Sequence, residues 1–195
     1  EGVQNKLQAG TYRLSPSEST PEIVTHLTSG KVDTFTITFL PGATLDDHRK
    51  VLIDAGYDTG EVDTALAKTY NSPLFQDKPA NASLEGYIYG ETYRFATDAS
   101  VEEILEYVFE QFYKVIQAHQ LIDAYRSQGL TLYQGITLAS IVQREASSAA
   151  DDMPTIAQVF YSRLALGMQL GSDVTYQYIA DKTGVPRDTN LDSPY

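Results

Sequence analysis

Residues 100–116 read SVEEILEYVFEQFYKVI, and this stretch is the strongest indication of fold class in the second half of the chain. Ser100 and Glu103 form a capping box, in which a hydroxyl and an acidic side chain three residues later start a helix. Apolar residues then recur at helical spacing for almost five turns. They are Val101, Ile104, Leu105, Val108, Phe109, Phe112, Val115 and Ile116. The pattern predicts a long amphipathic helix.

The chain on the C-terminal side of this helix continues the helical pattern. We predict one helix over about 137–150 and another over about 154–166, the second closed by Gly167. On the N-terminal side, residues 71–83 are rich in turn formers, which favours a domain boundary there. Residues 76–195 are therefore expected to form a mainly helical domain.

Residues 1–75 alternate between short helical and strand patterns. A helix capped by Thr20 is expected to end before Gly30. Residues 35–39 alternate phenylalanine or isoleucine with threonine, as in a half-buried strand. A capping-box start at Thr44 predicts a second helix, which Gly56 ends, and a third short helix is expected after Thr59. The predicted fold class is thus α+β, with a small α/β region before the helical domain.

The composition narrows the classes of function. The 195 residues are 42% apolar and 21% charged, which is typical of a globular protein. The formal net charge of −12 would repel nucleic acid, so we expect no nucleic acid partner. The absence of cysteine excludes disulfides and thiol catalysis. The chain has neither an initiator Met nor a long apolar run, and we expect it to be a segment of a longer protein that carries a membrane anchor.

Glu145 stands out on the helix predicted over 137–150. A step of four residues from Ile141, or of three from Val142, places it on the apolar face. A carboxylate among apolar neighbours loses hydration, which favours the protonated form that a general acid needs. Helical spacing leaves an alternative open, in which Glu145 lies at the edge of the face and reaches water or pairs with Arg144 or Arg163.

Six segments resemble, in the same order, motifs of the endolytic murein transglycosylase family, also called YceG-like proteins. They are AGTYR at 9–13, LEGYIYGETY at 84–93, LASIVQRE at 138–145, VFYSRL at 159–164, GMQLGSD at 167–173 and SPY at 193–195. The chain departs from the family pattern at three places. It has Gly90-Glu91 where the family has Pro-Asp, Gly171 where it has Gln, and Val174 where it has Pro.

The resemblance implies a function and a site. The fold would combine a LysM-like N-terminal region over 1–75 with a catalytic domain over 76–195 that is truncated at its C-terminus. Glu145 would be the catalytic residue of an endolytic lytic transglycosylase, which cuts the MurNAc–GlcNAc bond of peptidoglycan and leaves 1,6-anhydro ends. Neither a cofactor nor a metal is expected. The residues implied in substrate binding are Glu91, Tyr93, Ser172, Asp173 and Tyr176.

The same resemblance implies an extracytoplasmic location in the bacterial cell envelope, with peptidoglycan strands as substrate and the cell-wall synthesis machinery as a further partner. Two other functions remain open. The chain could be a noncatalytic peptidoglycan-binding or scaffold module, or a hydrolytic muramidase with Asp173 or Glu91 as second carboxylate. The three histidines lack the spacing of metal ligands and are expected on helix surfaces. Tyr87, Tyr93 and Tyr176 are candidates for stacking on sugar rings.

Overall fold

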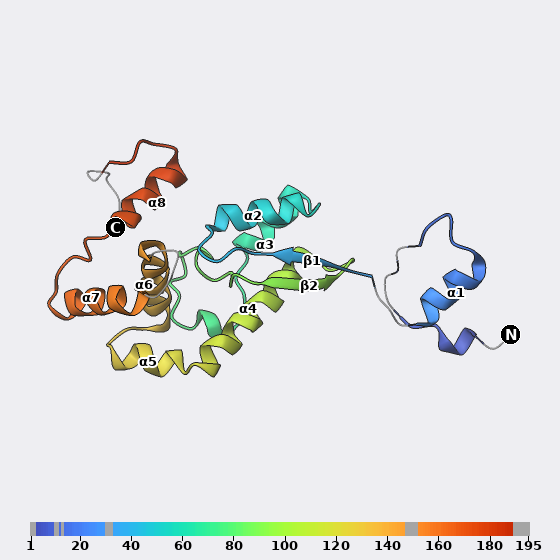
Figure 1. Cartoon of the computed structure of the whole chain (residues 1–195), viewed down its shortest axis with the longest axis horizontal. Helices are drawn as coiled ribbons and strands as arrows, with labels where there is room; N and C mark the ends of the chain where they lie inside the picture. The colour runs from blue at the N-terminus through green and yellow to red at the C-terminus, as the bar shows by residue number, and fades with distance from the viewer. Residues whose placement is uncertain (1–2, 10–11, 13, 30–32, 147–151, 189–195) are drawn as a thin grey trace. The chain divides into compact units, whose positions relative to one another are not determined.

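A computed structural model describes residues 3–9, 12, 14–29, 33–146 and 152–188 (Figure 1). Within these ranges lie eight α-helices and one two-stranded sheet, which confirms the mixed α+β class. The chain forms two compact units. Unit 1 consists of residues 1–70 and 83–112, and unit 2 consists of residues 71–82 and 113–195. A single boundary near residue 75 therefore does not describe the units.

The sheet of unit 1 joins two strands that are far apart in the sequence. Strand β1 (Thr34–Thr38) pairs with β2 (Thr92–Ala96) in antiparallel register. Phe35 stands opposite Phe95, and the Thr38 and Thr92 hydroxyls lie 2.8 Å apart. The strand predicted over 35–39 is confirmed. Its partner is not evident from the sequence, because the pairing reaches across the turn-rich segment that favours a boundary.

Helices α2 (Leu45–Asp54), α3 (Thr59–Ala67) and the first part of α4 (Val101–Ala118) complete the core of unit 1. Helix α2 packs against both α3 and β1. The predicted start of α2 is confirmed, because the Thr44 hydroxyl accepts a hydrogen bond from the Asp47 amide. The long helix predicted from residue 101 is also confirmed. In the described ranges no helix is both long and apolar enough to cross a bilayer.

His48 departs from the expectation that the histidines lie on the surface. It is only 5% exposed, and its Nε2 lies 3.4 Å from the Leu40 carbonyl oxygen. The ring also packs edge-on against Phe39, with 5.2 Å between centroids. Burial lowers the pKa of His48, since the charged imidazole would lose hydration. The packing of α2 turns this residue toward the core, which the sequence alone does not reveal.

Gly90 marks a close approach of two backbone segments in unit 1. A Cβ atom at this position would lie 2.5 Å from the Pro41 nitrogen and 2.6 Å from its Cα. Backbone atoms cannot move aside as the end of a flexible side chain can, so only glycine fits here. The departure from the family's proline at position 90 thus has a structural reason in this chain.

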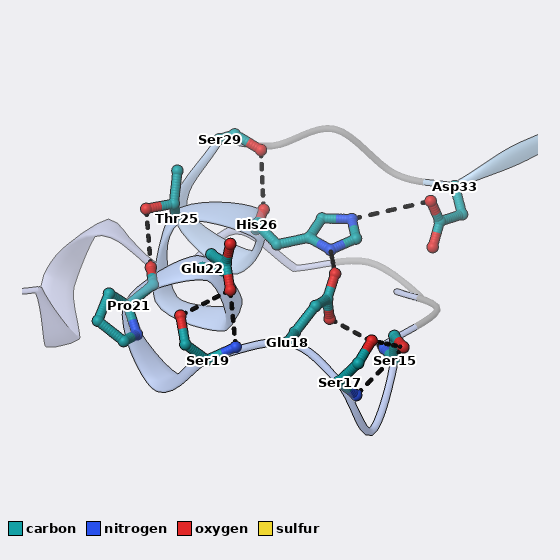
Figure 2. A network of polar contacts seen from close by, with 10 residues as sticks. All are labelled: Ser15, Ser17, Glu18, Ser19, Pro21, Glu22, Thr25, His26, Ser29 and Asp33. Atoms are coloured by element: carbon teal, nitrogen blue, oxygen red, sulfur yellow. Dashed lines mark hydrogen bonds and ion pairs between the residues drawn. The ribbon is translucent and has the colours of Figure 1, made fainter.

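The N-terminal part of unit 1 contains a 3₁₀ turn (Gln4–Lys6) and helix α1 (Thr20–Thr28). The predicted cap at Thr20 is wrong by one residue. Figure 2 shows Ser19 in that role, where its amide and hydroxyl both donate to the Glu22 carboxylate at 2.7 and 2.6 Å. The predicted end at Gly30 lies outside the described residues, as do Gly10, Thr11 and Arg13 of the first motif.

An imidazole links α1 to the segments on either side of it. His26 places its Nδ1 3.6 Å from the Glu18 carboxylate and its Nε2 3.7 Å from Asp33 (Figure 2). The Tyr12 ring meets the same imidazole edge-on at 5.6 Å between centroids. The side chain of His26 is 22% exposed and is therefore partly shielded from solvent. Its contacts connect the residues that precede α1 with those that follow it.

The described part of unit 2 is helical and contains two helices that the sequence patterns do not predict. It comprises α5 (Leu121–Ser127), α6 (Leu132–Glu145), α7 (Met153–Ala165) and α8 (Asp173–Thr183), of which α5 and α8 are the additional ones. Helix α6 packs against the other three.

Helix α6 begins earlier than the predicted start at residue 137. The Thr131 hydroxyl accepts from the Gln134 amide, so the capping box and the first turn lie upstream of the apolar motif. Ala146 has an extended backbone, which ends the helix at Glu145. The predicted continuation over 147–150 lies outside the described residues.

Candidate active site

Glu145 is the last residue of α6 and follows the face by which this helix packs. Leu138, Ile141 and Val142 are buried against Phe160 of α7. Glu145 continues this face, as the spacing predicts, but its side chain is exposed. The expectation of a carboxylate enclosed by apolar neighbours is therefore wrong. The end of a helix offers neighbours on one side only, so a residue in phase with the core still reaches solvent.

A pocket of about 240 Å³ lies beside the Glu145 carboxylate. Its walls are Ile156, Val159 and Phe160 of α7, together with Gly171 on the loop before α8. Pockets for drug-sized ligands commonly measure about 300–1,000 Å³. The volume at Glu145 therefore suits a single ring better than several. A carboxylate at the rim of an apolar pocket can exchange a proton with a polar group of a molecule whose apolar face fills it.

Ser172 holds the Glu145 carboxylate from below the surface. Its hydroxyl donates to Glu145 Oε1 at 2.5 Å, and the serine itself is 9% exposed. Hydrogen bonds between a hydroxyl and a carboxylate are short and stronger than those between neutral groups. One carboxylate oxygen is thus fixed by a buried donor, in a segment that also carries a family-like motif.

The loop that carries Ser172 is itself fixed on both sides. Arg163 of α7 donates from Nη1 to the Leu170 carbonyl oxygen, and the Thr175 hydroxyl donates to the Ser172 carbonyl oxygen at 2.9 Å. Gly171 between them has φ +63°, where side chains are strained, and a Cβ there would lie 2.7 Å from Arg163 Nη1. Arg163, considered as an ion-pair partner for Glu145, instead bonds to this loop.

Asp173 and Tyr176 lie on the first turns of α8, next to Ser172 in sequence. Asp173 is exposed at the first helical position, where a negative charge stabilises the helix. Tyr176 is half-buried. Neither residue lines the pocket beside Glu145. Their place on the same helix keeps both as candidates for contacts with a ligand larger than the pocket.

Two arginines, Arg144 on α6 and Arg187 after α8, act electrostatically on the carboxylate of Asp181. The Arg187 guanidinium donates to both oxygens of Asp181, at 3.1 and 2.8 Å. It thereby holds the pKa of Asp181 below its usual range, and Arg144 adds a weaker electrostatic effect in the same direction. The charge of Arg144, the sequence neighbour of Glu145, therefore acts on Asp181.

Tyr93, a candidate for substrate binding and for stacking on sugar rings, is buried in the core of unit 1. It is 5% exposed, its ring packs against Phe39 and Phe95, and its hydroxyl donates to the Tyr89 carbonyl oxygen at 2.9 Å. Burial raises the pKa of this phenol. The ring faces are occupied by the core because β2 alternates inward and outward residues, and Tyr93 points inward. The same correction applies to Tyr87, which is 1% exposed.

Glu91 is exposed in unit 1, where its Oε1 accepts a hydrogen bond from the Thr92 amide at 2.9 Å. This bond orders the carboxylate at the start of β2. Glu91 and Tyr93 belong to unit 1, whereas Glu145, Ser172, Asp173 and Tyr176 belong to unit 2. Of the predicted residues in unit 2, the structure brings Ser172 into direct contact with Glu145.

The sequence patterns assign no role to Phe160 or to the other α7 residues that line the pocket. They also do not predict that Arg163 of α7 holds the loop before α8. Phe160 and Arg163 lie in the segment 159–164, which resembles a family motif, so a signal for them is present. Their tasks cannot be read from it. A wall of a pocket and a donor to a loop carbonyl depend on how α7 packs against α6.

Comparisons with known proteins agree on one family. The sequence model of the YceG-like family matches residues 1–195. The chain is 29% identical to proteins named endolytic murein transglycosylase from two Streptococcus pneumoniae strains, with 97% of this chain and 40% of each relative aligned. It is 30% identical to a protein of the same name from Bacillus subtilis, over 96% of this chain and 56% of that relative. The chain thus spans about half the length of these curated relatives or less.

A solved structure supports the same relationship. A crystal structure of a yceG-like protein from Listeria monocytogenes superimposes with a TM-score of 0.67 at 27% identity. The match covers 97% of this chain and 68% of that one. The described fold is therefore similar to one found by experiment.

Proposed function

Because this chain belongs to the YceG-like family, we propose that it carries the catalytic glutamate of an endolytic lytic transglycosylase. The substrate is the glycan strand of peptidoglycan, cut at the MurNAc–GlcNAc bond within the strand. The name of the aligned relatives, endolytic murein transglycosylase, supports the class of reaction. The assignment of bond and product rests on the motif resemblance and on the chemistry available to Glu145.

One observation carries the proposal: a carboxylate stands at the rim of an apolar pocket and is held there by a buried hydroxyl. Glu145 lines the pocket, and Ser172 donates to its Oε1 at 2.5 Å. A sugar has an apolar face formed by its C–H groups, which suits the walls supplied by Ile156 and Phe160. A strand lying over the pocket would also exclude water from the exposed carboxyl group, which strengthens its interaction with the reacting atoms.

The reaction needs one group that both gives and takes a proton. In the first step, the Glu145 carboxyl group donates a proton to the glycosidic oxygen as the bond from that oxygen to C1 of the muramic acid breaks. The muramic acid 6-hydroxyl then attacks C1, and Glu145 takes the hydroxyl proton as general base. A new C1–O6 bond replaces the broken one, no water enters, and the carboxyl group returns to its starting form.

Product analysis of purified glycan strands tests the proposal. Uncrosslinked strands are incubated with this chain or with the Glu145→Gln variant. The products are then separated, and their masses are measured by mass spectrometry. We expect wild-type products with 1,6-anhydro ends, one water lighter than hydrolytic products. Removing a general acid–base typically costs about 10²–10⁴-fold in rate, so Glu145→Gln should lower the yield of these ends by at least about a hundredfold. Thermal unfolding of the variant serves as the control for folding.

The two alternative functions predict other results. A muramidase would leave reducing ends, and replacement of Asp173 or Glu91 by the corresponding amide would then abolish cleavage. A noncatalytic module would bind strands without shortening them, and Glu145→Gln would leave binding and products unchanged. Either outcome with folded protein would overturn the proposed activity.

The proposed substrate also sets where the protein would act and with what. Peptidoglycan lies outside the cytoplasmic membrane, so the proposal places the chain extracytoplasmically, with a membrane anchor in the full-length protein and the cell-wall synthesis machinery as a partner. The LysM-like role proposed for the N-terminal region is glycan binding. Strand binding would be measured for the chain itself and for a variant with substitutions at exposed positions within residues 1–75. This comparison tests that role separately from cleavage.

A further inference from the structure

Ser172 occupies the N-cap position of α8, but its hydroxyl does not cap that helix. Within the described residues of α8 no amide donates to it. At the starts of α2 and α6, by contrast, Thr44 and Thr131 accept such bonds from Asp47 and Gln134. A capping hydroxyl contributes to the stability of a helix because it accepts a hydrogen bond from one of the first amides. Ser172 forgoes this contribution and directs its hydroxyl at Glu145 instead.

Building on the proposed function, we infer that Ser172 is a positioning residue for Glu145 rather than a residue that binds substrate. Its bond to Oε1 orients the carboxyl group at the rim of the pocket and leaves Oε2 to carry the proton. Oε1 acts as an acceptor whether Glu145 is ionised or protonated on Oε2. The bond can therefore persist while the glutamate serves first as acid and then as base.

The surroundings of Ser172 argue against direct contact with a sugar. The residue is 9% exposed and is not among those that line the pocket. A hydroxyl has one proton to donate, and here that proton is used on Glu145. Positioning needs the rigid, buried setting that the structure provides, whereas recognition of a ligand needs an accessible donor.

Arg163 extends this arrangement by one step. Its Nη1 donates to the Leu170 carbonyl oxygen, two residues before Ser172, and Gly171 leaves room for the guanidinium. The Thr175 hydroxyl fixes the Ser172 carbonyl on the other side. The serine thus reaches Glu145 from a backbone segment that is held at both ends, which is what a positioning residue requires.

Kinetics of Ser172→Ala, Ser172→Thr and Ser140→Ala separate the two roles. A hydrogen bond to a charged group contributes about 1.5–3 kcal/mol, so Ser172→Ala should lower kcat by about 10- to 100-fold with little change in KM. Ser172→Thr keeps the hydroxyl and should recover much of this loss. Ser140 is an exposed serine on α6 whose hydroxyl donates to the Thr137 carbonyl, and its replacement by alanine is the matched control with unchanged kinetics.

Binding of an uncleaved strand gives the sharper distinction. In the Glu145→Gln background, which removes cleavage, addition of Ser172→Ala should leave the Kd for a defined glycan oligomer unchanged. A severalfold weaker Kd would assign Ser172 to substrate binding and overturn the inference. Equal kcat for Ser172→Ala and the wild type, with both proteins folded, would overturn it as well.

A readout without substrate keeps the inference testable if cleavage fails. NMR couplings across the Glu145 side chain should indicate one dominant rotamer in the wild type and in Ser172→Thr, and averaged rotamers in Ser172→Ala. Averaged couplings in the wild type would overturn the positioning role whatever the activity. If the couplings behave as expected but no anhydro ends are formed, the proposed function fails while the contact between Ser172 and Glu145 stands.

Discussion

The core between the sheet and helices of unit 1 and the contact between α6 and α7 in unit 2 differ in how completely they are closed. In unit 1, side chains such as Phe39, Leu52 and Leu105 have no exposed surface at all. Between α6 and α7 in unit 2, the buried residues Leu138, Ile141, Val142 and Phe160 keep 4–8% exposure. Apolar side chains on and after α7 remain open to solvent, among them Val159 at 45%, Leu166 at 74% and Met168 at 54%.

The difference in closure reflects how each of these regions uses its apolar surface. Unit 1 uses it for packing between the sheet and the helices, which stabilises the fold. The α6–α7 region of unit 2 leaves part of it unpacked as the walls of the pocket beside Glu145. A binding site needs apolar surface that the protein itself does not cover. We therefore expect mutations in unit 1 to act mainly on stability, and those near the pocket to act on activity at a lower cost in stability.

The largest expected effect is on a phenylalanine of the closed core. Phe109 is 1% exposed and packs edge-on against Tyr70 at 5.0 Å between centroids. Phe109→Ala should lower the free energy of unfolding by about 3–5 kcal/mol, since it leaves a cavity that rigid neighbours cannot fill. Phe160→Ala beside the pocket should cost less, near the lower end of that range, because its site is already open on one side. Urea denaturation, with unfolding of each unit monitored by hydrogen exchange, measures the loss of stability in both variants.

Glu106→Ala, at an exposed position of α4, is the control for this pair and should stay within about 0.5 kcal/mol of the wild type. If Phe160→Ala destabilised the protein as much as Phe109→Ala or more, the contrast between a closed core and an open one would be refuted.

The next effect tests how tightly unit 1 is packed. Gly90→Ala would place a methyl group 2.5 Å from the Pro41 nitrogen, and the backbone would have to shift. We expect a loss of about 1–3 kcal/mol in stability, the usual cost of overpacking. Thermal or urea unfolding measures this loss. Unchanged stability would mean that the segments carrying Gly90 and Pro41 can move apart at no cost. Unit 1 would then be less tightly packed than the low exposure of its core side chains indicates.

The smallest effect is a dependence of unit 1 on pH through His48. Burial lowers the pKa of this imidazole from its usual value of 6.5, so the folded state binds the proton less readily than the unfolded state. The contribution is fully present above about pH 6.5 and is lost as pH falls toward the folded pKa. The protection of unit 1 amides against hydrogen exchange should therefore fall as the pH drops below 6.5. His48→Gln should weaken this dependence, and an identical pH profile in the variant would contradict it.

Local patterns in the sequence predict much of the fold. The capping boxes at Thr44 and Ser100 and the spacing of the residues that follow place α2 and α4, since both signals depend on neighbours within one or two turns. The start of α6 at Thr131 has an equally local cap, but it lies about two turns ahead of the apolar motif from which that helix is predicted. Strand β2 escapes prediction because its pairing with β1 lies more than fifty positions away in the sequence.

Some features of the candidate site can likewise be predicted from local sequence patterns, whereas others depend on tertiary packing. Periodicity and motif order are properties of the chain, so the sequence is sufficient to put Glu145 in phase with the apolar face of a helix and to indicate one family. Three other features emerge only when the chain is folded: Tyr93 is buried, Glu145 stands at a rim and not inside, and Ser172 donates to it. These outcomes depend on which surfaces meet when distant helices and strands pack, and no spacing along a single chain records that.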